Sequence, residues 1–109
     1  MSAKIEYRQK EIRVYLSGEI DHHSAALIRA SIDDAIIHKH PSLLVLDFSA
    51  VTFMDSSGIG VLLGRLRILQ SRGGTMSVMN MQPPVEKLFR LSGLQRVIGI
   101  EKTHKGGRL

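Results

Sequence analysis

The feature that most constrains the fold is the stretch from Leu43 to Leu69, where an apolar run passes through a polar corner into an amphipathic segment. Leu43–Leu46 and Phe48 form an apolar run without strict alternation, which predicts a strand buried on both faces of a largely parallel sheet. After the corner, apolar residues recur at steps of three and four, which predicts a helix with one buried stripe. That stripe consists of Ile59, Leu62, Leu63, Leu66 and Leu69.

The polar corner has the sequence Asp55-Ser56-Ser57-Gly58. One of its first three residues is expected to be the helix N-cap, because each side chain can accept a hydrogen bond from a free N–H group of the first turn. Gly58 and Gly60 lie in that turn, where each glycine costs about 0.5–1 kcal/mol relative to alanine. The glycines leave bare backbone around the serine hydroxyls, at the positive end of a helix dipole. Two interpretations fit this arrangement equally well: Ser56 or Ser57 caps the helix, or another molecule approaches one of these serines.

Length and composition are typical of a small globular protein. The chain has 109 residues, 43% of them hydrophobic and 23% charged, and we expect a single domain over residues 1–101. It contains no cysteine, which excludes disulfides and thiolate chemistry. No apolar run approaches the roughly 18 residues of a membrane span and no signal segment is seen, so we expect a cytoplasmic protein without membrane contact.

The net charge of +5 raises the question of nucleic-acid binding. Lys102, Lys105 and Arg108 lie in the last eight residues, which hold no acid, and without them the net charge is +2. Aromatic residues are not interleaved with basic ones and no DNA- or RNA-binding motif is present, so we expect no direct contact with nucleic acid. Residues 102–109 are expected to form a basic, mobile tail.

The N-terminal part predicts a hairpin followed by a helix. Apolar and polar residues alternate over 4–8 and 11–17, which predicts two strands joined by a turn at Gln9 and Lys10. Gly18–Asp21 then forms a connector into a helix over 22–39, with Asp21 as its N-cap.

The C-terminal part predicts shorter elements. Gly73 and Gly74 are expected to end the serine-led helix, and a strand follows around Met76 to Val78. Pro83 and Pro84 open a short helix that Gly93 ends. A last strand is expected over Val97, Ile98 and Ile100.

This order predicts an α/β fold: a mixed, mostly parallel sheet of about five strands, with an antiparallel N-terminal hairpin at its edge and right-handed β/α crossovers. Loops that follow the carboxyl ends of parallel strands open on one sheet edge, where ligands bind. The loops 18–23, 52–57 and 81–84 are therefore expected to lie side by side. This arrangement brings Asp21, Asp55 and Ser56 into one neighbourhood.

Catalysis at this edge is disfavoured by what the sequence lacks. A hydrolase would need His22 or His23 as a base for Ser56, but the G-x-S-x-G pattern is absent, and Asp55 would oppose a developing oxyanion. The neighbouring histidines have no third ligand at a suitable spacing, so we expect no metal site. No phosphate-binding or dinucleotide-binding glycine pattern is complete. We therefore expect a protein that is not an enzyme and binds no cofactor.

The stretches GEIDHH and FMDSSGIGVLLGR closely resemble the STAS family, and specifically its anti-sigma factor antagonists of the sporulation type. The resemblance covers nearly the whole chain, and the two motifs together are highly specific. It implies a mixed sheet with β/α repeats, no enzymatic activity and one regulatory serine in the DSSG motif. That motif implies phosphorylation at Ser56, with Ser57 as a neighbouring hydrogen-bonding or structural residue.

The resemblance also implies partners. An unphosphorylated antagonist binds an anti-sigma factor that is a serine kinase and thereby releases a sigma factor; phosphorylation ends this binding, and a serine phosphatase restores it. Relatives usually end in a further helix, for which the short basic segment 103–109 is poorly suited. An alternative is an accessory subunit of a transport or signalling-scaffold assembly, because STAS-like domains also occur there with the DSSG motif.

The partner is expected to dock on the first turns of the serine-led helix and on the short helix after Pro83. Ile59, Gly60 and Leu88 are the expected contacts, and a charge at Ile59 is expected to leave stability nearly unchanged. The competing reading is that nearby Val61 and Ile68 complete a broad core face. Asp21, Asp55, Ser57 and Gly58 are expected to support the phosphorylation site.

Overall fold

The structure, a computed structural model, describes residues 2–101 of the chain. Its strands are β1 (Ser2–Arg8), β2 (Glu11–Ile20), β3 (Leu43–Met54), β4 (Thr75–Met79) and β5 (Gly99–Glu101). Its helices are α1 (His22–Lys39), α2 (Ser56–Ser71), α3 (Pro83–Leu91) and the short 3₁₀ helix η1 (Leu94–Arg96). The expectations about the tail 102–109, including the absence of a full final helix there, lie outside the described residues.

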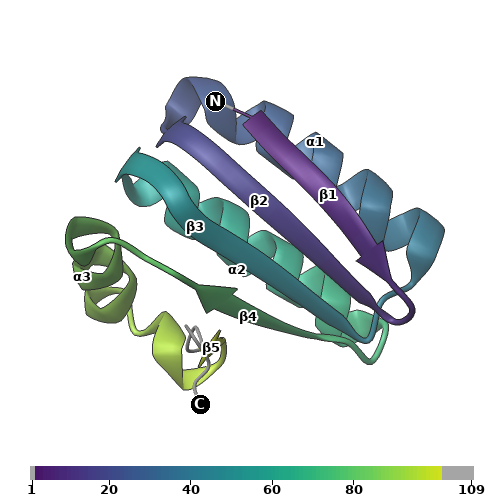
Figure 1. The fold of residues 1–109 in the computed structure, drawn as a ribbon. Helices are drawn as coiled ribbons and strands as arrows, with labels where there is room; N and C mark the ends of the chain where they lie inside the picture. The colour runs from purple at the N-terminus through teal and green to yellow at the C-terminus, as the bar shows by residue number, and fades with distance from the viewer. Residues whose placement is uncertain (1, 102–109) are drawn as a thin grey trace, which may run out of the picture.

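The strands form one sheet in the order β1-β2-β3-β4-β5, antiparallel between β1 and β2 and parallel elsewhere. α1 connects β2 to β3 and α2 connects β3 to β4, and both lie behind the sheet in Figure 1. The predicted mixed, mostly parallel sheet with an N-terminal edge hairpin is thus confirmed. None of the described helices is long and apolar enough to cross a membrane.

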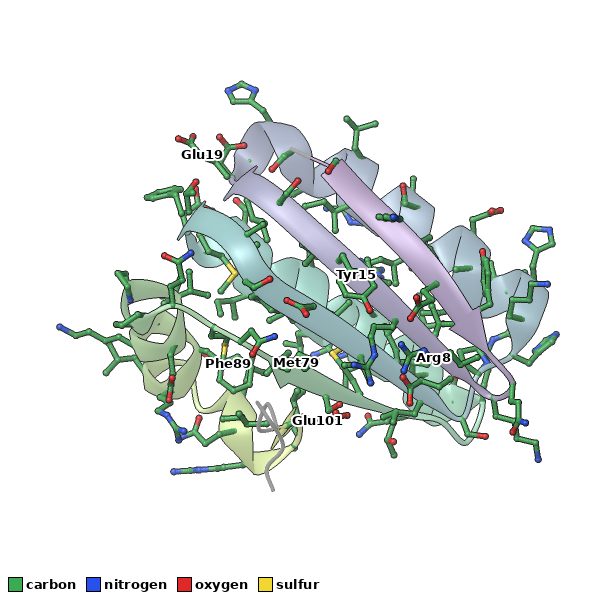
Figure 2. The ribbon with its side chains drawn as sticks, viewed as in Figure 1. Arg8, Tyr15, Glu19, Met79, Phe89 and Glu101 are labelled. Carbon is green, nitrogen blue, oxygen red and sulfur yellow. The ribbon has the colours of Figure 1, made fainter. Side chains whose placement is uncertain are left out.

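The hydrophobic core lies between the sheet and the two helices α1 and α2. Ile12, Val14 and Leu16, alternate residues of β2, are at most 3% exposed, and Leu46 and Phe48 of β3 are fully buried. The opposite sheet face is of mixed polarity: Tyr15, Asp47, Met79 and Glu101 align across neighbouring strands, and Figure 2 labels all but Asp47 on the side turned toward the viewer. A single hydrophobic core therefore supports the sheet edge at which function is expected.

Both strands that lead to the polar edge are longer than the sequence predicted. β2 continues through Gly18 to Ile20, so the expected connector Gly18–Asp21 is mostly strand. Register shifts between Tyr15 and Ser17 and between Gly18 and Glu19 interrupt its pairing with β3 and obscure the alternation in the sequence. β3 likewise runs to Met54, through the first half of the expected loop 52–57.

The C-terminal region differs from the prediction after α3. Leu94–Arg96 form η1, a 3₁₀ helix that the sequence did not predict. Val97 is 53% exposed and Ile98 is buried, but both precede β5, which begins only at Gly99. A buried isoleucine here belongs to a turn that packs on the core, which alternation in the sequence does not distinguish from a strand.

A buried ion pair joins the two main helices. The Nε atom of Arg65 in α2 lies 2.6 Å from the Oδ1 atom of Asp33 in α1, and the Arg65 side chain is only 8% exposed. The contact is ionic rather than a well-aligned hydrogen bond. It fixes α1 and α2 relative to each other, because removing either partner would leave a charge in a poorly solvated place.

Candidate functional site

The start of α2 is capped by Asp55. Its Oδ1 atom accepts a hydrogen bond from the Ser57 N–H group at 2.8 Å, and its carbonyl oxygen accepts one from the Gly58 N–H group at 3.0 Å. Of the three capping candidates in the sequence, the aspartate therefore takes the role. Neither serine is needed as the N-cap.

The two serines that follow are unequal. Ser56 is exposed, whereas Ser57 is half-buried. Within residues 2–101, neither hydroxyl takes part in a recorded hydrogen bond. Ser56 thus presents an accessible hydroxyl at the positive end of a helix dipole, with no neighbour that holds it in place.

The two glycines of the first turn do different things. Gly58 is buried, and a Cβ atom there would overlap the side chain of Met54 and come within 3.1 Å of Ile20 Cγ2. Gly58 therefore allows α2 to pack closely on the strand ends, a reason that local sequence could not show. Gly60 is exposed and a Cβ atom there would meet nothing within 4 Å, so packing does not explain this glycine.

The start of α1 is capped by Asp21, as predicted. Its Oδ1 atom accepts hydrogen bonds from the N–H groups of His23 at 2.9 Å and Ser24 at 3.0 Å. The Ser24 hydroxyl accepts one from the Asp21 N–H group at 3.0 Å, which completes a capping box. The backbone hydrogen bond from Ser24, followed by that from His23, lowers the pKa of the Asp21 carboxyl below its ordinary value.

The two helix starts are neighbours. Ile20 and Met54 are paired residues at the ends of β2 and β3, and the Asp55 N–H group donates to the Ile20 carbonyl oxygen at 3.2 Å. Asp21 and Asp55 therefore follow directly on adjacent strand ends, as the topology predicted. Glu19, labelled near this edge in Figure 2, adds a further exposed carboxylate.

The third expected loop, residues 81–84, lies alongside the middle of β3 and not at its end. Gln82 donates from Nε2 to the Ser49 carbonyl oxygen at 3.1 Å, and Asn80 donates from Nδ2 to Asp47 Oδ2 at 3.1 Å. These bonds hold the loop 81–84 alongside the middle of β3, before the strand reaches Asp55. α3 begins there, below the end of β3 in Figure 1.

The three predicted partner contacts have different surroundings. Ile59 and Leu88 are half-buried and pack against the core, so a charge at Ile59 is expected to cost stability, unlike in our sequence-based expectation. Gly60 is fully available on the surface. Val61 is 3% exposed and belongs to the core, which supports the broad core face that the sequence left open for this residue.

Sequence reasoning missed two exposed apolar residues at this edge. Phe53, at the end of β3, is 49% exposed, and Leu27 of α1 is 66% exposed. Leu27 lines an open groove of about 510 Å³ together with Gly18, Glu19, Asp21, His23 and Ser24. No alternation at the end of β3 announces the exposure of Phe53, since Thr52 and Phe53 are both exposed between the buried Val51 and Met54.

Metal binding finds no support in the described geometry. Residues 2–101 contain no group of three or more histidine or acidic side chains that could hold a metal ion. The rings of His22 and His23 meet edge to face at 5.9 Å, and both residues are exposed. The arrangement offers a free hydroxyl, two capped helix starts and a partly apolar rim, which suits modification and binding.

Comparison with known proteins identifies the family. The model of the STAS domain matches residues 3–106. The chain therefore belongs to the STAS domain family.

The similar proteins are more specific than the family. An anti-sigma F factor antagonist from Paenibacillus polymyxa is 38% identical over 100 residues, which cover 92% of this chain and 86% of the relative. The structure of the anti-sigma factor antagonist SpoIIAA in its unphosphorylated form has a TM-score of 0.83 at 33% identity, covering 96% of this chain and 90% of that one. The Bacillus cell fate determinant SpoIIAA in the phosphorylated form has a TM-score of 0.75 at 32% identity, covering 96% and 94%.

Proposed function

We propose that this chain is an anti-sigma factor antagonist whose binding is switched off by phosphorylation of Ser56. In this proposal the unmodified chain binds an anti-sigma factor that is also a serine kinase, and so releases a sigma factor. A serine phosphatase restores the unmodified form. Acting on the transcription machinery, the chain works in the bacterial cytoplasm, as a substrate and ligand without catalytic activity of its own.

The observation that carries the proposal is the free, exposed Ser56 hydroxyl beside a helix cap that another residue supplies. Asp55 satisfies the first turn, so modification of Ser56 does not remove the N-cap of α2. The similarity to SpoIIAA, described in both unphosphorylated and phosphorylated forms, supports a switch of this kind.

The chemistry of the modification is a phosphoryl transfer. The Ser56 oxygen attacks the γ-phosphorus of ATP bound to the kinase, the bond to the β-phosphate oxygen breaks, and ADP leaves. The hydroxyl proton passes to a base of the kinase. Within the described residues of the free chain, the carboxylates of Asp21 and Asp55 do not bond the Ser56 hydroxyl, but we expect them to help position it in the complex with the kinase, so removing them is expected to slow transfer more than it weakens docking.

The effect of the phosphate is local. It adds about 1.5–2 negative charges at pH 7, at a helix start whose dipole accommodates them, so the fold changes little. The same charges lie next to Asp55, at a sheet edge that also carries the exposed Glu19, on a surface that must lose water when the partner docks. A loss of about 3 kcal/mol already weakens binding by roughly a hundredfold.

The docking surface combines the first turn of α2 with exposed apolar side chains nearby. Gly60 keeps the helix surface flat, and Phe53 supplies an exposed ring at the end of β3. Ile59 and Leu88 contribute their exposed parts, while their buried parts hold them in place. Ser57 and Gly58 support the site from the helix side.

The test uses a candidate anti-sigma kinase, ATP and mass spectrometry of the phosphopeptide. Phosphate is expected on Ser56 in the unmodified sequence and in Ser57→Ala, and its loss is expected in Ser56→Ala. Ser56→Ala is also expected to stay bound to the partner when ATP is present. Phosphate on Ser57 alone, or equal binding by the phosphorylated and unmodified proteins, would contradict the proposal.

A further inference from the structure

The outer edge of the sheet offers a second interaction surface, two strands away from β3, the strand that leads to Ser56. β1 pairs only with β2 among the described strands, and Figure 1 shows it as the terminal strand of the sheet. Its seven residues pair with β2 without a register shift, and they include no proline. The bulges and prolines that commonly protect an edge strand are therefore missing.

The direction of the free backbone groups follows from the hairpin. Arg8 and Glu11 close a two-residue turn, and such a closing pair is hydrogen-bonded. Hydrogen-bonded and non-hydrogen-bonded pairs alternate along an antiparallel ladder. The N–H and C=O groups of Ala3, Ile5 and Tyr7 therefore point away from β2, along the open edge.

The charges on β1 are self-complementary. The sequence Lys4-Ile5-Glu6 places opposite charges on either side of Ile5. If two copies of β1 pair antiparallel about Ile5, Lys4 lies opposite Glu6 of the second copy, and Glu6 opposite Lys4. These would be non-hydrogen-bonded pairs, in which the Cα atoms approach to about 4.5 Å and opposite charges stabilise the pairing.

Other registers are disfavoured. The outward backbone groups pair again only after a shift of two residues, since a shift of one exchanges the two faces of the strand. A shift in one direction places Lys4 opposite Lys4, and a shift in the other places Glu6 opposite Glu6. The register centred on Ile5 is also the one in which all of Ser2–Arg8 is paired.

The side chains on the helix side fit the same register. Ile5 packs against the core and would face Ile5 of the second copy, while the exposed ring of Tyr7 would cover Ala3. The Nζ atom of Lys39 lies over the Tyr7 ring, 5.0 Å from its centre. Glu6 is already held by Arg8 and by the Tyr15 hydroxyl, so its carboxylate is oriented before pairing.

We propose that two copies of this chain associate through β1, antiparallel and centred on Ile5, to form one continuous sheet across a two-fold axis. Antiparallel pairing about an axis perpendicular to the sheet keeps the helices of both copies on the same face. The Ser56 sites lie away from this edge and remain accessible in both copies. The inference does not depend on the proposed phosphorylation switch.

Charge exchange tests the pairing. Sedimentation velocity of the untagged chain, over a concentration series into the millimolar range, is expected to show a reversible dimer. Lys4→Glu and Glu6→Lys alone are each expected to raise the dimer dissociation constant roughly tenfold or more. An equimolar mixture of these two variants, and the double variant Lys4→Glu/Glu6→Lys, are expected to recover the dimer. Lys10→Glu, with the same charge change in the exposed turn, is the matched control and is expected to dimerise normally.

An independent measurement covers the case in which Glu6→Lys unfolds, which a melting curve would reveal. The described chain has no cysteine, so one introduced thiol reports on one contact. Oxidation is expected to cross-link Ile5→Cys quickly, because the Cα atoms of a hydrogen-bonded pair lie about 5.5 Å apart. Tyr7→Cys is more exposed but has no copy of itself opposite, so it is expected to cross-link slowly. A monomer throughout the series, a dimer unaffected by Lys4→Glu, or faster cross-linking of Tyr7→Cys would overturn the proposal.

Discussion

The starts of α1 and α2 have the same general arrangement but differ three residues after the N-cap. Each follows one of two adjacent parallel strands, and each is capped by an aspartate, Asp21 or Asp55. Three residues after the cap, α1 has Ser24, which is buried and also donates to the Glu19 carbonyl oxygen at 2.9 Å. At that position α2 has Gly58, which has no side chain to close a capping box.

The difference shows that holding a helix in place and presenting a binding site are separate tasks of a helix start. At α1, side-chain hydrogen bonds close the helix start and use its polar groups. At α2, close packing of a bare Cα atom against Met54 holds the helix, and the serine hydroxyls stay free. A helix start that is held by packing against the strand ends can present its polar residues to a partner, as long as another residue supplies the N-cap.

The largest expected effect concerns the free hydroxyls themselves. Phosphorylation of Ser56 is expected to weaken anti-sigma factor binding roughly a hundredfold, because it places an uncompensated charge in a surface that loses water. Ser56→Asp should weaken binding in the same direction, though less, since one carboxylate carries less charge than a phosphate. Titration calorimetry with the partner measures both. Ser57→Asp is the matched control, and an equal loss there would assign the effect to general acidity.

The next prediction concerns the close packing at Gly58, which holds the start of α2 where a capping box holds the start of α1. Gly58→Ala is expected to lower the free energy of unfolding by about 1–3 kcal/mol, because the added methyl overlaps Met54 and crowds Ile20. Urea denaturation measures it. Combining Gly58→Ala with Met54→Ala should recover part of the loss caused by the overlap. If Gly58→Ala alone leaves the free energy of unfolding unchanged, the strand ends move aside more easily than the structure indicates.

A smaller effect distinguishes the two glycines of α2. Gly60→Ala is expected to raise the free energy of unfolding by about 0.5–1 kcal/mol, because its Cβ atom meets nothing and alanine favours helix. Partner binding is expected to fall at the same time. Gly64→Ala has the same free space, so its stability gain should match, and its effect on binding shows how far the docking surface extends along the helix. Undiminished binding by Gly60→Ala would remove Gly60 from that surface.

The smallest effect concerns the cap of α1 and its dependence on pH. The pKa of Asp21 is lowered in the folded state from its ordinary value of 3.8, so its charge stabilises the fold above that value, and this contribution is lost as the pH falls through the folded pKa. Asp21→Asn can still cap α1 but carries no charge. The stability difference between the two proteins should therefore be present at neutral pH and vanish in acid. A difference that persists unchanged below the folded pKa would show that charge is not its source.

The sequence predicted the helix starts well because capping is local. Asp21 and Asp55 each precede a periodic segment, and α1 was found with the predicted bounds. Extents that depend on tertiary contacts were harder: β2 and β3 run on to Ile20 and Met54 because they pair with each other through a bulged register. The tight packing at Gly58 depends on Met54, whose position the sequence of α2 does not contain. The exposure of Phe53 likewise depends on which elements leave the end of β3 uncovered.

The order of strands in the sheet equals their order in the chain, and this has a consequence for how the protein is made. Each strand added during synthesis finds the edge left by the one before it, so no strand must be inserted between two that have already paired. The hairpin β1–β2 can form first, and the proposed phosphorylation site needs only β2, β3 and the two helix starts. We therefore expect ribosome-bound chains in which β4 has just left the exit tunnel to resist proteolysis around Ser56, before α3 and β5 emerge; cleavage at that point would show that the last elements are required. In this order of assembly, Ser56 takes its place on the nascent chain before α3, the second helix of the proposed docking surface, emerges.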